Sequence, residues 1–206
     1  MTKAKNKSRG SLILSGREIE GLDRDRFKHV VRLAGTGPSP DECPYGAVGD
    51  RLWVQERFSL LRRWRTETDG VEIEYVRFAV NTTQGDNFAF MLDGKRTTMD
   101  QLGLTQEQID DMLAWKVNFN RSNNLERWAS RLTVNLASVH LCKLHDLWAP
   151  QLRQLGFGEN DDSGEAVLRD FIGYWDLGTR QGYRWVSNPN VWIIALDPIW
   201  SNIDNL

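Results

Sequence analysis

The stretch Cys43-Pro-Tyr-Gly-Ala-Val-Gly-Asp-Arg-Leu-Trp-Val-Gln-Glu-Arg-Phe58 decides the predicted fold of this chain. It contains two turn signals, at residues 44–46 and at Gly49-Asp50. The residues 51–54 that follow predict the start of a buried strand. That strand would deliver the charged pair Glu56-Arg57 where its apolar pattern ends. Such a pair suits a ligand site at the end of a strand, and it equally suits a salt bridge at the rim of the fold.

The composition is typical of a soluble globular protein, because 40% of the 206 residues are hydrophobic and 26% are charged. No apolar run approaches the roughly 20 residues that a membrane helix needs. Residues 1–10 are basic but lack the apolar core of a signal peptide, so we expect a flexible tail and a cytoplasmic protein without a membrane partner. The net charge of −2 gives no global attraction for a polyanion, although clustered basic residues could still form one basic face.

The cysteines and histidines do not predict a metal site. Cys43 and Cys142 lie far apart and show no CxxC spacing, and the three histidines do not complete a zinc pattern with them. One disulfide is formally possible, but two buried thiols are the expected state of a cytoplasmic protein. We therefore expect neither a metal nor a cofactor.

The periodicity of the chain predicts strands interleaved with short helices, which is the pattern of an α+β fold. Helices are expected at 17–22, after a capping box formed by Thr105 and Gln108, at 144–155, and after a cap at Ser163. Strands are expected at 11–14, 27–33, 51–54, 71–80, 128–141 and 190–196.

Four segments of the chain, taken together, resemble a known family. In order they are Ile13-Leu-Ser-Gly16, the stretch from Cys43 to Phe58, Arg127-Trp-Ala-Ser-Arg-Leu132 and Asn188-Pro-Asn-Val-Trp-Ile-Ile194. They resemble the phage and prophage proteins of the ASCH type, which belong to the PUA-like superfamily. The resemblance implies a small mixed β-barrel with flanking helices over residues 11–206, elaborated by a helical insertion at about 81–124.

The family resemblance also implies a function. PUA-like domains commonly bind RNA, and relatives read modified bases in aromatic-lined pockets. Some small ASCH proteins are amidohydrolases that deacetylate N4-acetylcytidine with a lysine, a threonine and a glutamate. This chain departs from that pattern, because Phe27 occupies the lysine position and Val30 the threonine position. Lys28 is one residue out of register, which turns a strand side chain to the opposite face.

Glu56 is the leading candidate site residue. Its carboxylate could accept a hydrogen bond from the exocyclic amine of cytosine or adenine, or it could act as a general base. The alternative is an ion pair with Arg57, Arg131 or another basic neighbour.

A second candidate set combines cations with a stacking plane within five residues. Arg127, Trp128 and Arg131 suit a phosphate and a base lying side by side. On the expected strand, however, the two arginines share one face and Trp128 takes the other. The alternative makes Trp128 part of the core and the arginines part of the rim. Residues 62–65 form a further basic cluster, which suits either backbone contacts or a solvated loop.

Three functional hypotheses follow from these residues. The first is a module that binds RNA, DNA or a modified nucleoside, with its site lined or flanked by Arg32, Glu56, Arg57, Arg127, Trp128 and Arg131. The second is a hydrolase in which Glu56 acts as acid or base and Lys28 polarises the substrate carbonyl. The third is a phage interaction or structural protein without a ligand.

Overall fold

The computed structural model describes residues 10–34, 43–59, 62–65, 72–92, 95–114, 119–120, 122–158 and 163–206. Within the chain, the contacts define two compact units. The first unit holds residues 1–10, 24–52 and 134–199, and the second holds residues 11–23, 53–133 and 200–206. The expected tail at 1–10 lies, except for Gly10, outside the described residues.

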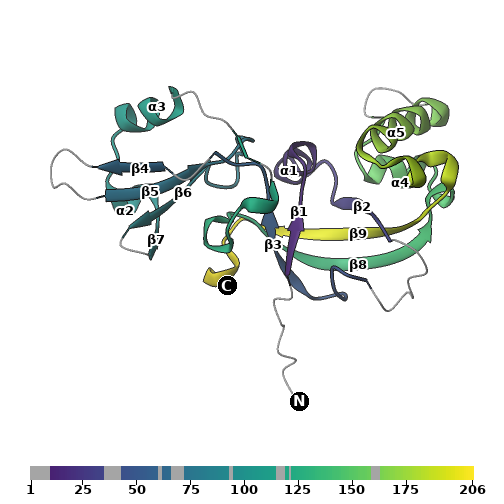
Figure 1. The fold of residues 1–206 in the computed structure, drawn as a ribbon, viewed down its shortest axis with the longest axis horizontal. Helices are drawn as coiled ribbons and strands as arrows, with labels where there is room; N and C mark the ends of the chain where they lie inside the picture. Colours follow the sequence, from purple (N-terminus) through teal and green to yellow (C-terminus); the bar gives the residue numbers. More distant parts are fainter. Residues whose placement is uncertain are drawn as a thin grey trace, which may run out of the picture. The chain divides into compact units, whose positions relative to one another are not determined.

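The fold is mixed α+β, as the periodicity predicts, and its strands form two sheets (Figure 1). One sheet has the order β1 (Gly10–Ile13), β3 (Arg51–Gln55), β8 (Thr133–Lys143), β9 (Asn190–Ile199) and β2 (His29–Leu33). The other has the order β4 (Arg62–Arg65), β5 (Glu72–Arg77), β6 (Phe88–Leu92) and β7 (Lys95–Thr97). In the first sheet β1 and β2 are edges, so the described strands do not close into a barrel.

In the first unit β9 is an interior strand, and it pairs with β2 in antiparallel register from His29–Ala195 to Leu33–Val191. The apolar run of β9 is largely buried, as expected for a central strand. The strand itself continues past Pro198 to Ile199. The helices α4 (Ala149–Gln154) and α5 (Gly164–Gly178) pack against each other (Figure 1). Ser163 caps α5 by accepting a hydrogen bond from the Ala166 amide, as predicted. The core cluster of this unit includes Leu152, Val167, Phe171, Trp175 and Val191.

The predicted helix at 144–155 is wrong in its first half. The chain forms a short 3₁₀ helix at Leu144–Asp146, and α4 begins only at Ala149. Pro150 stands in the first turn of α4. A proline is tolerated there, but farther inside a helix it would remove a hydrogen bond and clash with the preceding turn.

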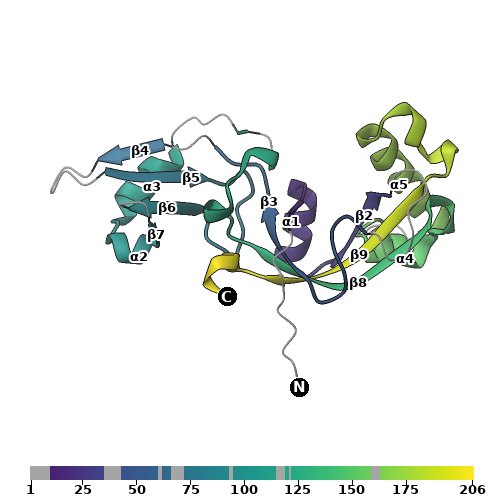
Figure 2. The ribbon, with the colours of Figure 1, turned by 60° about the horizontal axis from the view of Figure 1, so that its bottom comes forward.

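In the second unit, β4 to β7 form an antiparallel meander with the helices α2 (Met99–Leu102) and α3 (Gln106–Ala114) beside it (Figure 2). The predicted capping box is confirmed, because Thr105 and Gln108 exchange hydrogen bonds of 2.8 and 3.3 Å at the start of α3. The helix α1 (Gly16–Asp23) has the same device in Ser15 and Glu18. A cluster of Ile73, Tyr75, Phe88, Phe90 and Met112 joins the sheet to α3.

The predicted strand at 128–141 begins too early, since β8 starts at Thr133. Arg127–Ala129 is instead a 3₁₀ helix, and another 3₁₀ helix covers Ser122–Asn124. The expectation that Arg127 and Arg131 share a strand face is therefore wrong. The side-chain amide of Asn202 donates to the carbonyls of Arg127, Trp128 and Ser130, so remote contacts override the local β preference.

Both cysteines are free. Across the described ranges, no group of three or more His, Cys, Asp and Glu side chains is arranged to hold a metal ion. No helix among these residues has the length and apolar character needed to cross a membrane.

Candidate functional site

Glu56 and Arg131 form a buried ion pair in the second unit. The Arg131 Nε donates to Glu56 Oε1 at 2.8 Å, and Nη2 donates to Oε2 at 2.6 Å. Each residue is only 2% exposed. Two parallel bonds between a guanidinium and a carboxylate are among the strongest hydrogen-bonded pairs in proteins. Of the two interpretations of Glu56, the geometry matches the ion pair, and a ligand would have to compete with Arg131 for both oxygens.

The remaining donors of Arg131 hold one loop of the second unit. Its Nη2 donates to the Val80 carbonyl at 2.8 Å, and its Nη1 reaches Thr82 Oγ1, the Asp86 carbonyl and Asn87 Oδ1 at 2.8 to 3.0 Å. The guanidinium also lies 4.3 Å above the Phe78 ring. Arg131 is thus a fully hydrogen-bonded structural residue, whereas the sequence predicted a ligand-binding residue or, as the alternative, part of the rim.

Burial of the ion pair raises the pKa of the Glu56 carboxyl. The hydrogen bonds and the charge of the adjacent Arg131 guanidinium lower that pKa and so oppose the effect of burial. The carboxylate is therefore costly to keep ionised without its partner. Removal of Arg131 would leave an uncompensated acid in the interior.

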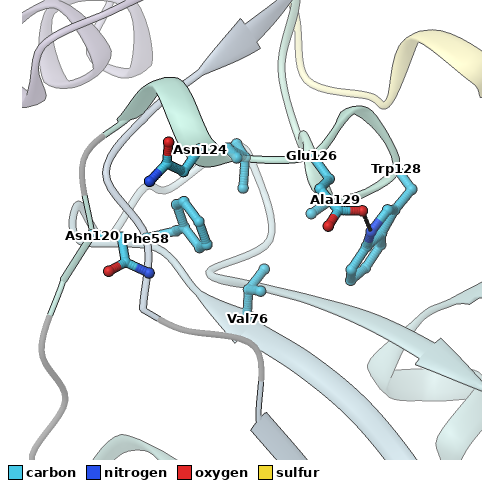
Figure 3. A pocket seen from close by; sticks show the side chains of 8 residues that line it. Phe58, Val76, Asn120, Asn124, Glu126, Trp128 and Ala129 are labelled. Atoms are coloured by element: carbon cyan, nitrogen blue, oxygen red, sulfur yellow. Dashed lines mark hydrogen bonds between the residues drawn. The ribbon is translucent and has the colours of Figure 1, made fainter.

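A pocket of about 250 Å³ lies in the second unit (Figure 3). Phe58 and Trp128 stand on different sides of it, and Val76 lies between them. The other lining residues are Asn120, Asn124, Leu125, Glu126 and Ala129. The pocket therefore combines two aromatic rings with two amides and one carboxylate.

The indole of Trp128 is oriented by its neighbour. Trp128 Nε1 donates to Glu126 Oε2 at 2.9 Å (Figure 3). Glu126 is exposed, so its carboxylate is accessible to solvent and to a ligand in the pocket. Trp128 is half-buried and packs beside the cluster that contains Phe58, Val76 and Phe78. Trp128 thus combines a contact with this core cluster, as the alternative expected, with a place in the pocket wall.

Backbone contacts hold the pocket walls in place. Phe58 forms an isolated β-bridge with Phe78. The backbone N–H of Asn120 donates to the Phe58 carbonyl at 2.6 Å. The Gln55 side chain donates to the carbonyls of Asn123 and Leu125 at 3.1 and 3.2 Å. These bonds fix the segment that carries Asn124 and Glu126.

A second group of contacts fixes the wall that carries Trp128. The Arg96 guanidinium donates to the carbonyls of Trp128 and Ser130, and the Asn202 amide donates to the same two carbonyls. Burial lowers the pKa of Arg96, although nearby Asp86 and Asp204 oppose that effect. The pocket is thus preformed, as is usual for small-molecule sites.

The structure brings only some of the predicted site residues near this pocket. Arg127 and Trp128 are neighbours in one 3₁₀ helix, but the Arg127 guanidinium binds the Asp204 carboxylate at 2.6 Å. This ion pair raises the pKa of Arg127 and lowers that of Asp204. Arg57 is exposed and directly precedes Phe58. Glu56 and Arg131 do not line the pocket.

Two predicted residues belong to the first unit. Arg32 lies half-buried in β2 and donates from Nη1 to the Val31 carbonyl at 2.9 Å. Lys28 is exposed and pairs with Asp25 at 2.9 Å. Lys28 lies in the first unit and Glu56 in the second, so the predicted catalytic pair is divided between the two units. The side chains of the basic cluster at 62–65 lie outside the described residues.

Sequence reasoning missed most of the pocket. Asn120 and Asn124 belong to the polar, asparagine-rich end of the expected insertion, and Glu126 lies just beyond it. Phe58 is the last residue of the opening motif. The available signal was the combination of amides, a carboxylate and aromatic residues between positions 118 and 128. This combination of residue types indicates which polar and aromatic groups could bind a ligand. It does not indicate that they meet Phe58 around one pocket, because that arrangement depends on the bridge between Phe58 and Phe78.

Comparison of the chain with protein-family models, with curated proteins and with solved structures finds no significant match.

Proposed function

We propose that this protein is a nucleic-acid-binding module that accepts one unstacked base in the pocket between Phe58 and Trp128. The observation that carries the proposal is the composition of that pocket, in which aromatic planes and hydrogen-bonding side chains line one cavity. Aromatic rings stack on bases of any sequence, and each stacked base contributes about 1–3 kcal/mol. Amide and carboxylate groups recognise the edge of a base through its donors and acceptors.

The size of the pocket favours a single base. Its volume of about 250 Å³ is below the usual range of roughly 300–1,000 Å³ for sites that hold drug-sized ligands. Proteins that read single-stranded RNA take unstacked bases between aromatic side chains and bond their edges. A base extruded from a strand, or a free nucleoside, therefore suits the cavity better than a duplex.

The resemblance to ASCH proteins of the PUA-like superfamily supports the same function. As part of the same proposal, we take from this resemblance a PUA-like β-barrel, a modified base as ligand, an RNA or DNA partner and a phage origin. The role of recognising the base edge moves, however, from Glu56 to Glu126 and the two asparagines of the pocket, whereas Trp128 keeps its expected stacking role. Glu56 and Arg131 then support the pocket instead of touching the ligand.

Binding is preferred to the amidohydrolase alternative. The Glu56 carboxylate already accepts two hydrogen bonds from Arg131, and Lys28 is paired with Asp25. A general base must reach the proton that it removes, and Arg131 occupies both oxygens of Glu56. The Lys28 ammonium, which would polarise the substrate carbonyl, is held by Asp25. The third alternative, an interaction protein without a ligand, does not account for a preformed pocket with polar groups in it.

Binding of labelled single-stranded RNA and DNA, measured by fluorescence anisotropy at several salt concentrations, tests the proposal. Trp128→Ala should weaken binding by about 5- to 150-fold, the equivalent of one stacked base. Trp148→Ala is the matched control, since Trp148 is 61% exposed and lies in the first unit. Wild-type protein that binds neither nucleic acid in low salt would overturn the proposal, because phosphate attraction is greatest there.

A further inference from the structure

A second pocket lies in the first unit, where β2 and α5 end. It is an open cavity of about 490 Å³ lined by Leu33, Ala34, Gly178, Thr179, Arg180 and Tyr183. Its lining differs from that of the Trp128 pocket, because it carries a guanidinium and no carboxylate. A site with a cation, a hydroxyl and a phenol ring suits an anionic ligand that also presents a flat or apolar surface.

The loop that carries Arg180 and Tyr183 is held in place by hydrogen bonds. The buried Trp175 donates from Nε1 to the Tyr183 carbonyl at 2.9 Å, and the Tyr183 amide donates to the Arg180 carbonyl at 2.9 Å. Farther along, the Trp185 amide donates to Asp176 Oδ1 at 2.7 Å. Rigid support of this kind reduces the entropy lost when a ligand binds.

The Arg180 guanidinium is exposed and makes no ion pair or side-chain hydrogen bond with a residue that the structure describes. An arginine just after a helix commonly binds the last carbonyls of that helix, whose carboxyl end carries partial negative charge. No such bond joins Arg180 to the end of α5 within the described part of the chain. Its donors are therefore accessible to a ligand.

The charge around this loop favours an anion. Arg184 is exposed four residues after Arg180, and within the described ranges its side chain also has no ion pair. The carboxylate of Asp176, the nearest acidic residue in sequence, accepts the Trp185 amide. Within the pocket, the Arg180 guanidinium and the Tyr183 phenol ring together match a phosphodiester linked to a sugar or base.

We infer that the Arg180 pocket binds a phosphate of a single-stranded nucleic acid, with the guanidinium on the phosphate oxygens and the Tyr183 ring against the attached nucleoside. The inference rests on the proposed function, and it assigns the two pockets different tasks. Phosphate contacts fix the position of a strand and carry no sequence information, whereas base contacts specify the sequence. The Arg180 pocket holds a phosphate, and the Trp128 pocket accepts a base.

Salt dependence distinguishes the two tasks. The affinity for a single-stranded oligonucleotide falls with salt with a logarithmic slope of about −0.7 for each neutralised phosphate. Arg180→Gln should therefore weaken binding at low salt and make the slope shallower by about 0.7. Arg180→Lys keeps the charge and should keep most of the slope. Trp128→Ala should weaken binding with the slope unchanged.

The experiment uses the full chain, a fluorescein-labelled twelve-nucleotide RNA and at least four salt concentrations. Arg169→Gln is the matched control, because Arg169 is an exposed arginine of α5 that does not line the pocket. If Arg180→Gln binds with the wild-type affinity and slope, or if Arg169→Gln changes both by the same amount, this inference is overturned while the proposed function stands. If the wild-type chain binds no nucleic acid, the proposed function itself fails.

Discussion

Glu56 and Arg131 are joined by two hydrogen bonds of 2.8 and 2.6 Å although 75 positions separate them in the chain. Glu56 precedes the pocket residue Phe58 by two positions, and Arg131 follows the pocket residue Trp128 by three. The buried ion pair therefore fastens together the two segments that carry the aromatic walls of the pocket. This relationship gives Glu56 a positioning role that its place in the family motif did not indicate.

Glu56→Gln should destabilise the protein strongly, because it leaves the Arg131 charge buried without its partner. Breaking a buried ion pair on one side typically costs about 3–5 kcal/mol. Urea unfolding followed by circular dichroism measures the free energy of unfolding. The double variant Glu56→Gln with Arg131→Met should recover part of the loss, since it removes both charges. A single variant as stable as the wild type would show that the pair does not hold the fold.

Glu126→Gln should change which base the Trp128 pocket prefers. The carboxylate accepts from the exocyclic amine of cytosine and repels the O4 carbonyl oxygen of uracil, whereas the glutamine amide can donate to that oxygen. We expect the preference for cytidine over uridine to fall by about tenfold, the equivalent of roughly 1.4 kcal/mol. Calorimetric titration with both nucleosides measures the change.

Glu107→Gln is the matched control for this variant, because Glu107 is an exposed carboxylate in the first turn of α3. It should leave the preference unaltered. An unchanged ratio of the two affinities in Glu126→Gln would rule Glu126 out as the group that reads the base edge.

The stability of the first unit should decrease as the pH falls below 6.5. Burial lowers the pKa of His29 below its usual value of 6.5, so the folded state binds this proton less readily than the unfolded state. The contribution of neutral His29 is thus complete above pH 6.5 and is lost as the pH falls from there toward the lowered pKa. Urea midpoints at pH 7.5 and 5.5 measure the loss.

His29→Gln should reduce this pH dependence, because the glutamine does not titrate. His140→Gln is the control, since His140 is exposed on β8. If His29→Gln loses as much stability between the two pH values as the wild type, another group causes the effect.

The elements that the sequence predicted correctly are those whose signals are local. The Ser163 cap, the Thr105 capping box and the apolar run of β9 each depend on residues within a few positions. The strand predicted at 128–141 was wrong in its first residues, because the remote Asn202 side chain binds the carbonyls of Trp128 and Ser130. The Trp128 pocket was missed for a similar reason, since its walls meet through tertiary contacts that no spacing records.

Gly156→Ala should destabilise the first unit because Gly156 has a backbone φ of +79° and lies against Phe27. An added Cβ would lie 2.3 Å from the Phe27 ring. The left-handed backbone costs an alanine roughly 1–2 kcal/mol, and overpacking adds about 1–3 kcal/mol. Gly182→Ala is the matched control, since nothing lies within 4 Å of the added Cβ and its φ is not positive.

This experiment also tests the role of Phe27, the residue at the family's lysine position. Phe27 is 7% exposed and packs on Gly156, so the structure uses that position for the core of the first unit. Phe27→Leu in the Gly156→Ala background should restore part of the lost stability by relieving the clash. Equal urea midpoints for wild type and Gly156→Ala would show that Phe27 is not fixed there, and the position would again be open to a functional side chain.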